Sequence, residues 1–577
     1  MTEINYRSVS PLAPSPMLPA SPVAPQGAQR RWRLPFVLSL SWELIVLLLT
    51  LAGGLGLNLG LVDRFPLRED EALYSYWALV FWRVDPFFLH VWPDKPPLWI
   101  GTLSAFFALL GPSQVTARLP NILVSTLTIA LVWLTARRLW GSAPATLAGL
   151  FYALNPFAIS FAATAYTDPM LVFWGQLAFY LAVSGRWFGA GLGLAAAIMT
   201  KQQGVFYAPL LLGLLLFARR APTQGWAQEP LYHRPDHRPD HRPDHRSYRR
   251  PWLACIGGLL TLLLPILYWD SLRWAVAPSP WDLSIRNYGE LTLSSPTLWG
   301  ARLQQWGALL WCYAGSWWGW WLLLGLTSYG LWRRQRRVQA GRRPINDQAA
   351  IVGLMVCWAL GFLLLHLVTT IQIWDRYLLP LIPMSVLLVS WAATYALSNR
   401  EGQHRLRQQV LGVLLLVGCL LPTALHAAQG QLPIGGDHGA YSGLTTAIDW
   451  LKQHAPTNVV LYHQRLGWHY HFYLFDQEQA GDYELRWFPS AVYLADNAVK
   501  TPERQRFLIQ PAWAPVRDLA LHLAMRKLQL IPLQHFAQMT IYAVKPKDAP
   551  ACTWCLCRPR WQLQPLAGAE ERMTRQP

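Results

Sequence analysis

The residues from Leu44 to Val62, LIVLLLTLAGGLGLNLGLV, form the first long apolar run of this 577-residue chain. It carries no charged residue over 19 positions, which is enough for a helix to cross a hydrocarbon core of about 30 Å. A basic cluster at Arg30–Arg33 precedes it, as in a secretory signal. The run is too long for a signal peptide, however, and no small-residue cleavage site follows. We therefore expect a first transmembrane helix with a cytoplasmic N-terminus.

Further apolar runs recur along the chain, and together with the first they predict about eleven transmembrane helices. The composition agrees, because 53% of the residues are hydrophobic and only 14% are charged, which excludes a disordered chain and an ordinary soluble basic protein. The additional spans are expected at 116–136, 143–163, 169–185, 187–200, 204–218, 252–269, 303–331, 349–369, 377–397 and 410–428.

The net charge of +18 invites a nucleic-acid interpretation, but the distribution of the charges argues against it. When the spans are threaded from a cytoplasmic N-terminus, one side collects 24 of the 49 basic residues and 8 of the 31 acidic ones, or +16 of the total. Such asymmetry follows the positive-inside rule. The charge therefore indicates orientation in a plasma (inner) membrane, and no nucleic-acid partner is expected.

The same threading divides the chain into three regions. Residues 1–35, rich in Pro, Ser and Ala, are expected to form a disordered cytoplasmic N-terminus, and residues 36–428 a transmembrane domain. Within the latter, the cytoplasmic segment 219–250 repeats His-Arg-Pro-Asp at 233–246. A His-rich metal-binding tract is one interpretation, but a solvated linker is favoured because a proline at every fourth position forbids a helix that would align the imidazoles.

Residues 429–577 differ in kind and predict a small extracytoplasmic α/β domain. Apolar runs predict strands at 459–462, 491–494, 506–509 and 540–544, with helical patterns at 444–453 and 516–527. Near the C-terminus, a C-x2-C-x-C cluster is a weak metal signal without a second pair or a histidine; its role stays open, and it comprises Cys552, Cys555 and Cys557.

Ionisable residues gather at the helix ends predicted to be extracytoplasmic. Charges at a membrane boundary are functional candidates because burying them is costly, although solvated interfacial anchoring would explain any single one. The loop 63–115 is the richest, and its first segment suits an amphipathic interfacial helix whose acids also complement the helix dipole. The set comprises Arg68, Glu69, Asp70, Glu71, Asp94, Lys95, Asp168, Lys201 and Arg376.

Several short motifs occur in order across residues 40–400. They are Asp70-Glu71-Ala72-Leu73-Tyr74, Lys95-Pro96-Pro97-Leu98, Ala117-Arg118-Leu119-Pro120, Arg137-Arg138-Leu139-Trp140-Gly141, Thr167-Asp168-Pro169, Thr200-Lys201-x-x-Gly204 and Arg376-Tyr377-Leu378-Leu379-Pro380. In this order they resemble integral-membrane glycosyltransferases of the GT-C fold. The resemblance is closest to the superfamily of dolichyl-phosphate-mannose protein mannosyltransferases and lipid A aminoarabinose transferases.

The resemblance implies transfer of a sugar from a polyprenyl-phosphate donor to a lipid, glycan or protein acceptor on the extracytoplasmic side. Asp70 would be the general base of an inverting reaction, and Glu71 would orient the acceptor or Asp70. Cations would hold the donor phosphate. The residues expected to bind the substrate or the donor phosphate are Arg68, Lys95, Asp168, Lys201, Arg376 and Tyr377.

Asp168 has several interpretations. It resembles a second acidic position of the superfamily and would position the acceptor or sugar, or hold a metal, yet an N-cap followed by proline at N1 also explains it. No added set of histidine ligands makes a metal compelling, so no cofactor is assigned and a divalent metal stays open. No sequon-binding signature or inserted β-trefoil segment is visible, which makes a lipid or glycan acceptor at least as plausible as a protein.

Two other classes of protein compete with the enzyme. A lipid or lipid-linked-sugar flippase would show charges or broken helices near the membrane centre and often internal repeats, whereas here the charges lie at helix ends. A non-catalytic scaffold that displays the C-terminal domain leaves the set around Asp70 and Lys95 unexplained. A glycosyltransferase in contact with membrane lipid is therefore expected.

Overall fold

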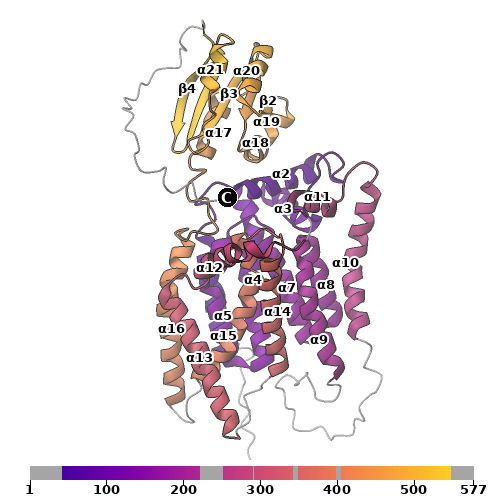
Figure 1. The fold of residues 1–577 in the computed structure, drawn as a ribbon, viewed down its shortest axis with the longest axis vertical. Coiled ribbons are helices and arrows are strands. Elements are labelled where there is room, and N and C mark those ends of the chain that lie inside the picture. Colours follow the sequence, from indigo (N-terminus) through magenta and orange to yellow (C-terminus); the bar gives the residue numbers. More distant parts are fainter. Residues whose placement is uncertain (1–41, 221–250, 290–291, 342–347, 398–403, 548–577) are drawn as a thin grey trace, which may run out of the picture.

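The computed structural model describes residues 42–220, 251–289, 292–341, 348–397 and 404–547. These residues form a helical bundle with an α/β domain at one end (Figure 1). We call the end of the bundle nearest this domain the domain face. The expectations for residues 1–35, for the repeat at 233–246 and for Cys552, Cys555 and Cys557 lie outside the described residues.

The bundle is built from apolar helices. Among the described residues, four helices are long and apolar enough to span a membrane, and a bent pair adds a fifth: α1 (Trp42–Leu59), α4 (Gln114–Trp140), α10 (Pro251–Arg273), α14 (Ala349–Val368), and α5 (Ser142–Ala153) with α6 (Pro156–Ala162). The pair bends by 55° at Asn155, whose side chain caps α6 by accepting a hydrogen bond from the Ala158 N–H.

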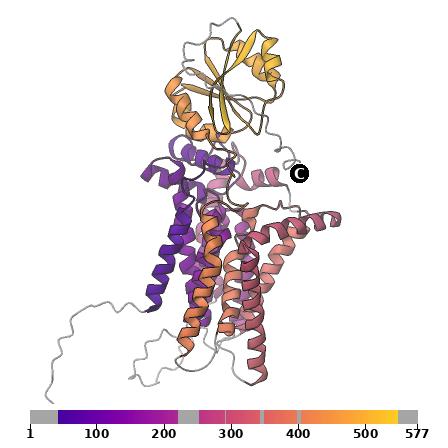
Figure 2. The same cartoon turned by 90° about the vertical axis from the view of Figure 1, so that its left-hand side faces the viewer.

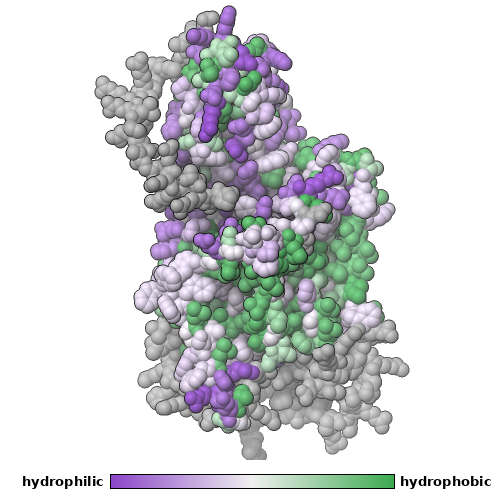
Figure 3. All heavy atoms as spheres, in the orientation of Figure 1, coloured by the Kyte–Doolittle hydropathy of each residue, from purple (hydrophilic) through white to green (hydrophobic). Residues whose placement is uncertain are grey.

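The remaining helices of the bundle are shorter or less apolar. They are α7 (Asp168–Val183), α8 (Trp187–Thr200), η1 (Gln202–Tyr207), α9 (Ala208–Arg220), α13 (Trp317–Gln339), α15 (Leu381–Leu397) and α16 (His404–Ala428). Except for α13, they coincide with expected spans, although the count of about eleven stays a prediction. Hydrophobic side chains cover the visible flank of the bundle, and hydrophilic ones dominate the C-terminal domain (Figure 3), so the protein is an integral membrane protein.

The expected single span at 303–331 is wrong, because the chain breaks there into two helices. Gly315 adopts a left-handed conformation (φ +68°), which ends α12 (Trp299–Ala314). Ser316 then caps α13 by accepting a hydrogen bond from the Gly319 N–H at 3.0 Å. As a result α12 lies across the domain face, whereas α13 runs along the bundle (Figures 1 and 2).

Three further helices lie at the domain face, and they shape the candidate site (Figure 1). They are α2 (Glu69–Arg83), α3 (Pro97–Leu110) and α11 (Pro280–Tyr288). A helix expected in the loop 63–115 is present as α2, which buries Tyr74 and Trp77 against the bundle, and its amphipathic character stays a prediction. The short helix α11 was not predicted, although a Ser279 N-cap followed by Pro280 is a typical helix start.

The C-terminal domain is a five-stranded mixed sheet in the order β2-β1-β3-β5-β4. Strand β1 is parallel to β2 and β3, and β5 is antiparallel to β3 and β4. The strands are β1 (Val459–His463), β2 (Tyr483–Trp487), β3 (Gln505–Pro511), β4 (Leu528–Phe536) and β5 (Met539–Pro546). Alternate residues of β1 enter two separate cores, as expected for a sheet covered on both faces.

Helices cover the two faces of this sheet. The core on one face includes α17 (Leu444–His454), and the core on the other includes α20 (Ala491–Lys500) and α21 (Leu519–Ala524). The strands expected at 459–462, 506–509 and 540–544 and the helix at 444–453 are confirmed, and the helix at 516–527 is confirmed in part.

The strand expected at 491–494 is wrong, because these residues begin helix α20. Ser490 caps the helix by accepting a hydrogen bond from the Tyr493 N–H at 3.3 Å. Ala491, Leu494, Ala495 and Ala498 are its buried residues, and their spacing is that of one helix face. The opposite face is exposed and carries Val492, Tyr493, Asp496 and Val499.

The domain docks on the bundle through α18 (Gly467–Tyr473), which contacts α2. His469 Nε2 lies 2.7 Å from the carbonyl oxygen of Leu67 and donates to it, and the hydroxyl of Tyr473 accepts a 3.4 Å hydrogen bond from the Leu67 N–H. Burial lowers the pKa of His469 to about 4, so the imidazole is neutral near pH 7. The residues that lead into α2 are thus bonded to the C-terminal domain.

Candidate active site at the domain face

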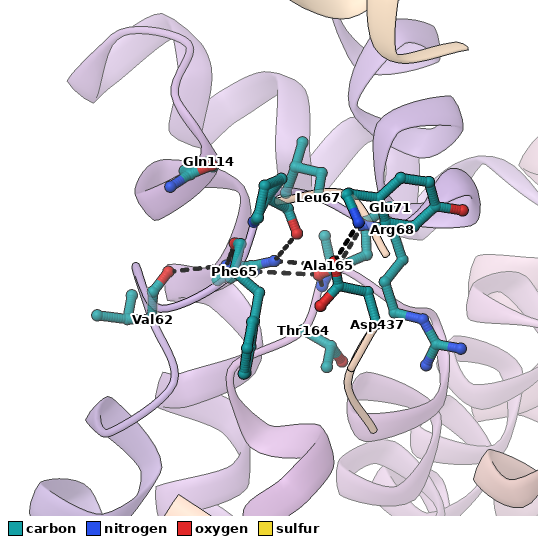
Figure 4. Close-up of polar contacts among 12 residues, drawn as sticks. Val62, Phe65, Leu67, Arg68, Glu71, Gln114, Thr164, Ala165 and Asp437 are labelled. Carbon is teal, nitrogen blue, oxygen red and sulfur yellow. Dashed lines mark hydrogen bonds and ion pairs between the residues drawn. The ribbon is translucent and has the colours of Figure 1, made fainter. Parts of the chain in front are cut away.

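The first turn of α2 fixes Glu71 as a fully paired, buried carboxylate. Glu71 accepts hydrogen bonds from the N–H groups of Arg68 (2.8 Å) and Ala165 (2.7 Å), and the Arg118 guanidinium binds both its oxygens at 3.1 Å (Figure 4). Arg118 also donates to three carbonyls of the loop that enters α2, those of Val62, Phe65 and Pro66.

These donors determine the ionisation of Glu71. Burial by itself raises the pKa of a carboxyl group, but the Arg118 guanidinium and the two backbone donors outweigh it and hold the pKa of Glu71 below its ordinary value. With its oxygens occupied by protein donors, Glu71 anchors the entry to α2. Arg118 belongs to one of the sequence motifs, but the sequence does not place it in the site, because its partner Glu71 lies 47 positions away.

Asp70, the neighbour of Glu71, belongs to a different network of charges. Its carboxylate accepts a 2.7 Å hydrogen bond from Arg376 Nη2, and its side chain remains 34% exposed. Arg376 lies in η3 (Asp375–Leu378), and its Nε is 3.7 Å from the carboxylate of Asp168. Asp168 in turn accepts a 2.6 Å hydrogen bond from Lys201 Nζ. Four separate elements thus bring together a row of alternating charges.

The position of Asp168 excludes one of its interpretations. Thr167 is the N-cap of α7 and Asp168 is its first helical residue, so the N-cap interpretation of Asp168 is wrong. The carboxylate is 1% exposed and turns toward Lys201, the residue that follows α8. Asp168 therefore balances the buried cations Lys201 and Arg376.

Lys95 lies in a second pair beside this row. Its Nζ donates to Asp94 at 2.9 Å and to the hydroxyl of Tyr288 at 2.8 Å, and Asn287 donates to the other oxygen of Asp94 at 2.9 Å. Tyr288 and Asn287 lie at the end of α11, which sequence analysis missed. Lys95 is 4% exposed, so its charge is enclosed by these partners.

A cavity of about 280 Å³ lies between these groups. Three cations, Lys95, Lys201 and Arg376, line it, and Tyr377 is a lining residue whose ring centroid lies 4.3 Å from Lys201 Nζ. Apolar side chains complete the lining, and they include Val205, Phe206, Ile285 and Ile371. The lining thus suits an amphipathic anion.

Arg68 does not line this cavity but reaches the same neighbourhood. Its guanidinium carbon is 5.6 Å from the ring centroid of Tyr166, and that of Arg376 is 4.6 Å from the same centroid. Nη1 of Arg68 is buried and has no hydrogen-bond partner among the described residues. Figure 4 shows the guanidinium extending away from Glu71. A buried donor without a partner is costly, and one N–H group of Arg68 therefore stays unsatisfied within the described residues.

The carboxylates of the site do not form a metal centre. Within the described ranges, no group of three or more His, Cys, Asp or Glu side chains is arranged to hold an ion. The carboxylate of Asp168 pairs with Lys201 and Arg376. The carboxylate of Asp94 pairs with Lys95 and accepts a hydrogen bond from Asn287. These residues do not fit a divalent metal, and the mechanism below contains no metal step.

Both the sequence and the structure of this membrane protein are similar to those of known proteins. Residues 94–232 match the family model of dolichyl-phosphate-mannose-protein mannosyltransferases. The structure is similar to that of ArnT from Cupriavidus metallidurans bound to undecaprenyl phosphate, with 17% identity, a TM-score of 0.53 and coverage of 87% of this chain and 98% of that chain.

The apo form of the same ArnT gives a TM-score of 0.54 at 16% identity, with coverage of 87% of this chain and 97% of that chain. No curated protein matches the chain by sequence. The chain therefore has the GT-C fold, and the resemblance to the mannosyltransferase and ArnT superfamily expected from the motifs is confirmed.

Proposed function

We propose that this protein is a glycosyltransferase that moves a sugar from a polyprenyl-phosphate donor to a hydroxyl of an acceptor on the extracytoplasmic side of the membrane. The observation that carries the proposal is the ion pair between Asp70 and Arg376, because Arg376 lines one partly apolar cavity together with Lys95 and Lys201. The cations suit a lipid phosphate, and the apolar lining suits the start of a polyprenyl chain. The match to ArnT bound to undecaprenyl phosphate supports the same class of donor.

The charge balance of the site suggests how binding of the donor frees Asp70 from its ion pair with Arg376. Three carboxylates (Asp70, Asp94 and Asp168) face three cations (Lys95, Lys201 and Arg376), so the paired groups carry no formal net charge. A lipid phosphate competes with Asp70 for Arg376 because phosphate binds a guanidinium strongly, often through two bonds. Binding of the donor thereby releases the carboxylate of Asp70 to act as a base.

The chemical step then needs one base and a stabilised leaving group. Asp70 takes the proton of the acceptor hydroxyl as its oxygen attacks the anomeric carbon, and the bond from that carbon to the phosphate oxygen breaks. Polyprenyl phosphate leaves with the electron pair, and the cations stabilise its added charge. Attack opposite the leaving group inverts the anomeric centre. Glu71 acts through Arg118 as a positioning residue for Asp70.

The experiment compares Asp70→Asn with wild-type protein in nanodiscs that contain radiolabelled polyprenyl-phosphate hexoses or pentoses and an envelope lipid and glycan extract. We expect transfer to fall by a factor of roughly 10²–10⁴, the usual contribution of a general base, while undecaprenyl phosphate still binds. The matched control is Asp63→Asn, an exposed carboxylate of the same loop, and it should transfer normally. Near wild-type transfer by Asp70→Asn would contradict the assignment. Movement of the intact donor across the bilayer without a glycosylated product would instead favour a flippase.

A further inference from the structure

A second hollow, of about 360 Å³, lies where the C-terminal domain meets α2. We call it the junction pocket. Glu69 contributes to it from α2, the segment after β1 contributes Arg465 and Trp468, and Trp487 closes it from the end of β2. Its volume falls within the range of about 300–1,000 Å³ that is common for small-molecule sites. None of the groups assigned to the donor cavity lines it.

The lining combines aromatic faces with groups that both donate and accept hydrogen bonds. Trp468 is 38% exposed and Trp487 is 56% exposed, so two indole rings that line the pocket are accessible to a ligand. Glu69 only accepts hydrogen bonds and Arg465 only donates them, whereas the amide of Gln464 does both. The charges of Glu69 and Arg465 cancel, so the pocket has no charge bias toward a phosphate or a polyanion.

A buried histidine gives the pocket a second, independent sign of a ligand. His463 is 6% exposed and lines the pocket, and its Nδ1 has no hydrogen-bond partner within the described part of the chain. Burial, with a smaller contribution from His471, lowers the pKa of His463 to about 4, so the ring is neutral near pH 7. A Cβ atom on Gly467 would lie 2.7 Å from His463 Cε1, so the glycine allows the backbone to approach this ring closely.

A neutral sugar ring matches this combination. The C–H face of a pyranose packs on indole rings, and its hydroxyl groups need donors and acceptors at the same time. We propose that the junction pocket binds a neutral pyranose unit of the acceptor, so that the acceptor is a glycan or a glycolipid. This role as an acceptor site rests on the proposed function.

The position of the pocket relative to the base supports this role. Glu69 directly precedes Asp70, so their Cα atoms are about 3.8 Å apart, and successive side chains on a helix point about 100° apart. Glu69 therefore faces the C-terminal domain while Asp70 faces Arg376. A glycan held in the junction pocket has its next sugar within reach of Asp70, which gives the C-terminal domain a function in acceptor selection.

Saturation-transfer NMR on the full-length protein in nanodiscs tests the pocket without any transfer reaction. The probes are the methyl α- and β-pyranosides of glucose, mannose, galactose and N-acetylglucosamine. We expect ring protons of at least one probe to receive saturation, and the signal to persist when undecaprenyl phosphate fills the donor cavity. Absence of saturation for every probe, or its loss with undecaprenyl phosphate, overturns the proposal.

Two variants assign the signal to the pocket. We expect Trp487→Ala and Arg465→Ala each to weaken the signal roughly tenfold, and Tyr493→Ala, an exposed aromatic of α20 outside the pocket, to leave it unchanged. Circular dichroism verifies that each variant is folded, and an undiminished signal in both pocket variants overturns the proposal. Asp70→Asn should bind the probe normally. Glycoside binding without any transfer activity would thus contradict the proposed function alone.

Discussion

Asp70 and Glu71 are neighbours in the chain, yet their carboxylates lie in two differently built regions. The region around Glu71 surrounds the carboxylate with Arg118 and two backbone N–H groups and excludes solvent. The region around Asp70 offers one cation, Arg376, and leaves a third of the side chain exposed. Neighbouring carboxylates of one motif thus differ in how many fixed partners they have, and only that of Asp70 stays accessible to a ligand.

The largest effect on stability is expected from Glu71→Gln. The substitution leaves the Arg118 guanidinium buried without a counter-charge, and breaking a buried ion pair in this way typically costs roughly 3–5 kcal/mol. We expect a much lower thermal midpoint and a reduced yield of folded protein. Glu69→Gln, at an exposed carboxylate in the same turn, is the matched control and should change stability by less than about 0.5 kcal/mol. Similar thermal midpoints for the two variants would contradict the anchoring role of Glu71.

The next effect concerns the cation that faces Asp70. Arg376→Ala removes charge-assisted hydrogen bonds worth roughly 1.5–3 kcal/mol, so undecaprenyl phosphate should bind about 10- to 150-fold more weakly. The control is Arg64→Ala, which removes an exposed arginine of the loop between α1 and α2 that does not line the cavity, and this variant should bind normally. Filter binding of radiolabelled lipid measures both, and equal affinities would exclude Arg376 from the phosphate site.

A smaller effect is expected from pH. Burial lowers the pKa of Lys201 to about 8, with Asp168 opposing the shift and Arg376 and Lys95 adding to it. The ammonium is therefore present below pH 8 and lost above it, so the affinity for undecaprenyl phosphate should fall as pH rises from about 7 to 9. Lys201→Arg keeps its charge throughout this interval and should flatten the profile. An identical profile for both proteins would show that Lys201 does not titrate here.

The smallest effect is expected at the rim of the domain junction. Arg83 Nη1 and the carboxylate of Asp476 form an ion pair of 2.6 Å, with side chains 32% and 71% exposed. Exposed pairs contribute only about 0.2–1 kcal/mol, so Asp476→Ala should hardly change thermal unfolding. A loss comparable with that of Glu71→Gln would mean that the junction depends on this pair rather than on the buried contacts of His469 and Tyr473.

Sequence periodicity predicted the bundle well, because a long apolar run has few alternatives in a membrane. It failed where one residue decides the outcome. Gly315 breaks the expected span at 303–331, and the Ser490 cap converts the expected strand at 491–494 into α20. Strand β4 was missed because Pro532 interrupts its apolar pattern, and it also carries an irregularity in pairing between Pro532 and Gln534.

The candidate site was predicted as a set of residues but not as a set of pairs. Ionisable residues at one membrane face are visible in a sequence, whereas their partners are not, because Asp70 and Arg376 are 306 positions apart. For the same reason the sequence suggests a catalytic role for Glu71 but does not show that Arg118 binds its carboxylate. Nothing in the sequence places Tyr288 and Asn287 in the site, apart from the helix start at Ser279 that positions α11.

The loop that joins α16 to the C-terminal domain has a consequence for the order in which the protein matures. Gly435 (φ +72°) packs against the backbone of Ser160, and its N–H donates to the carboxylate of Asp375, the residue beside Arg376, at 3.2 Å. Leu67, before α2, bonds to His469. During synthesis, the loop that carries Asp70 is made before Gly435 and His469, the residues that bond to Asp375 and Leu67. The candidate site is therefore completed only after the C-terminal domain has been made.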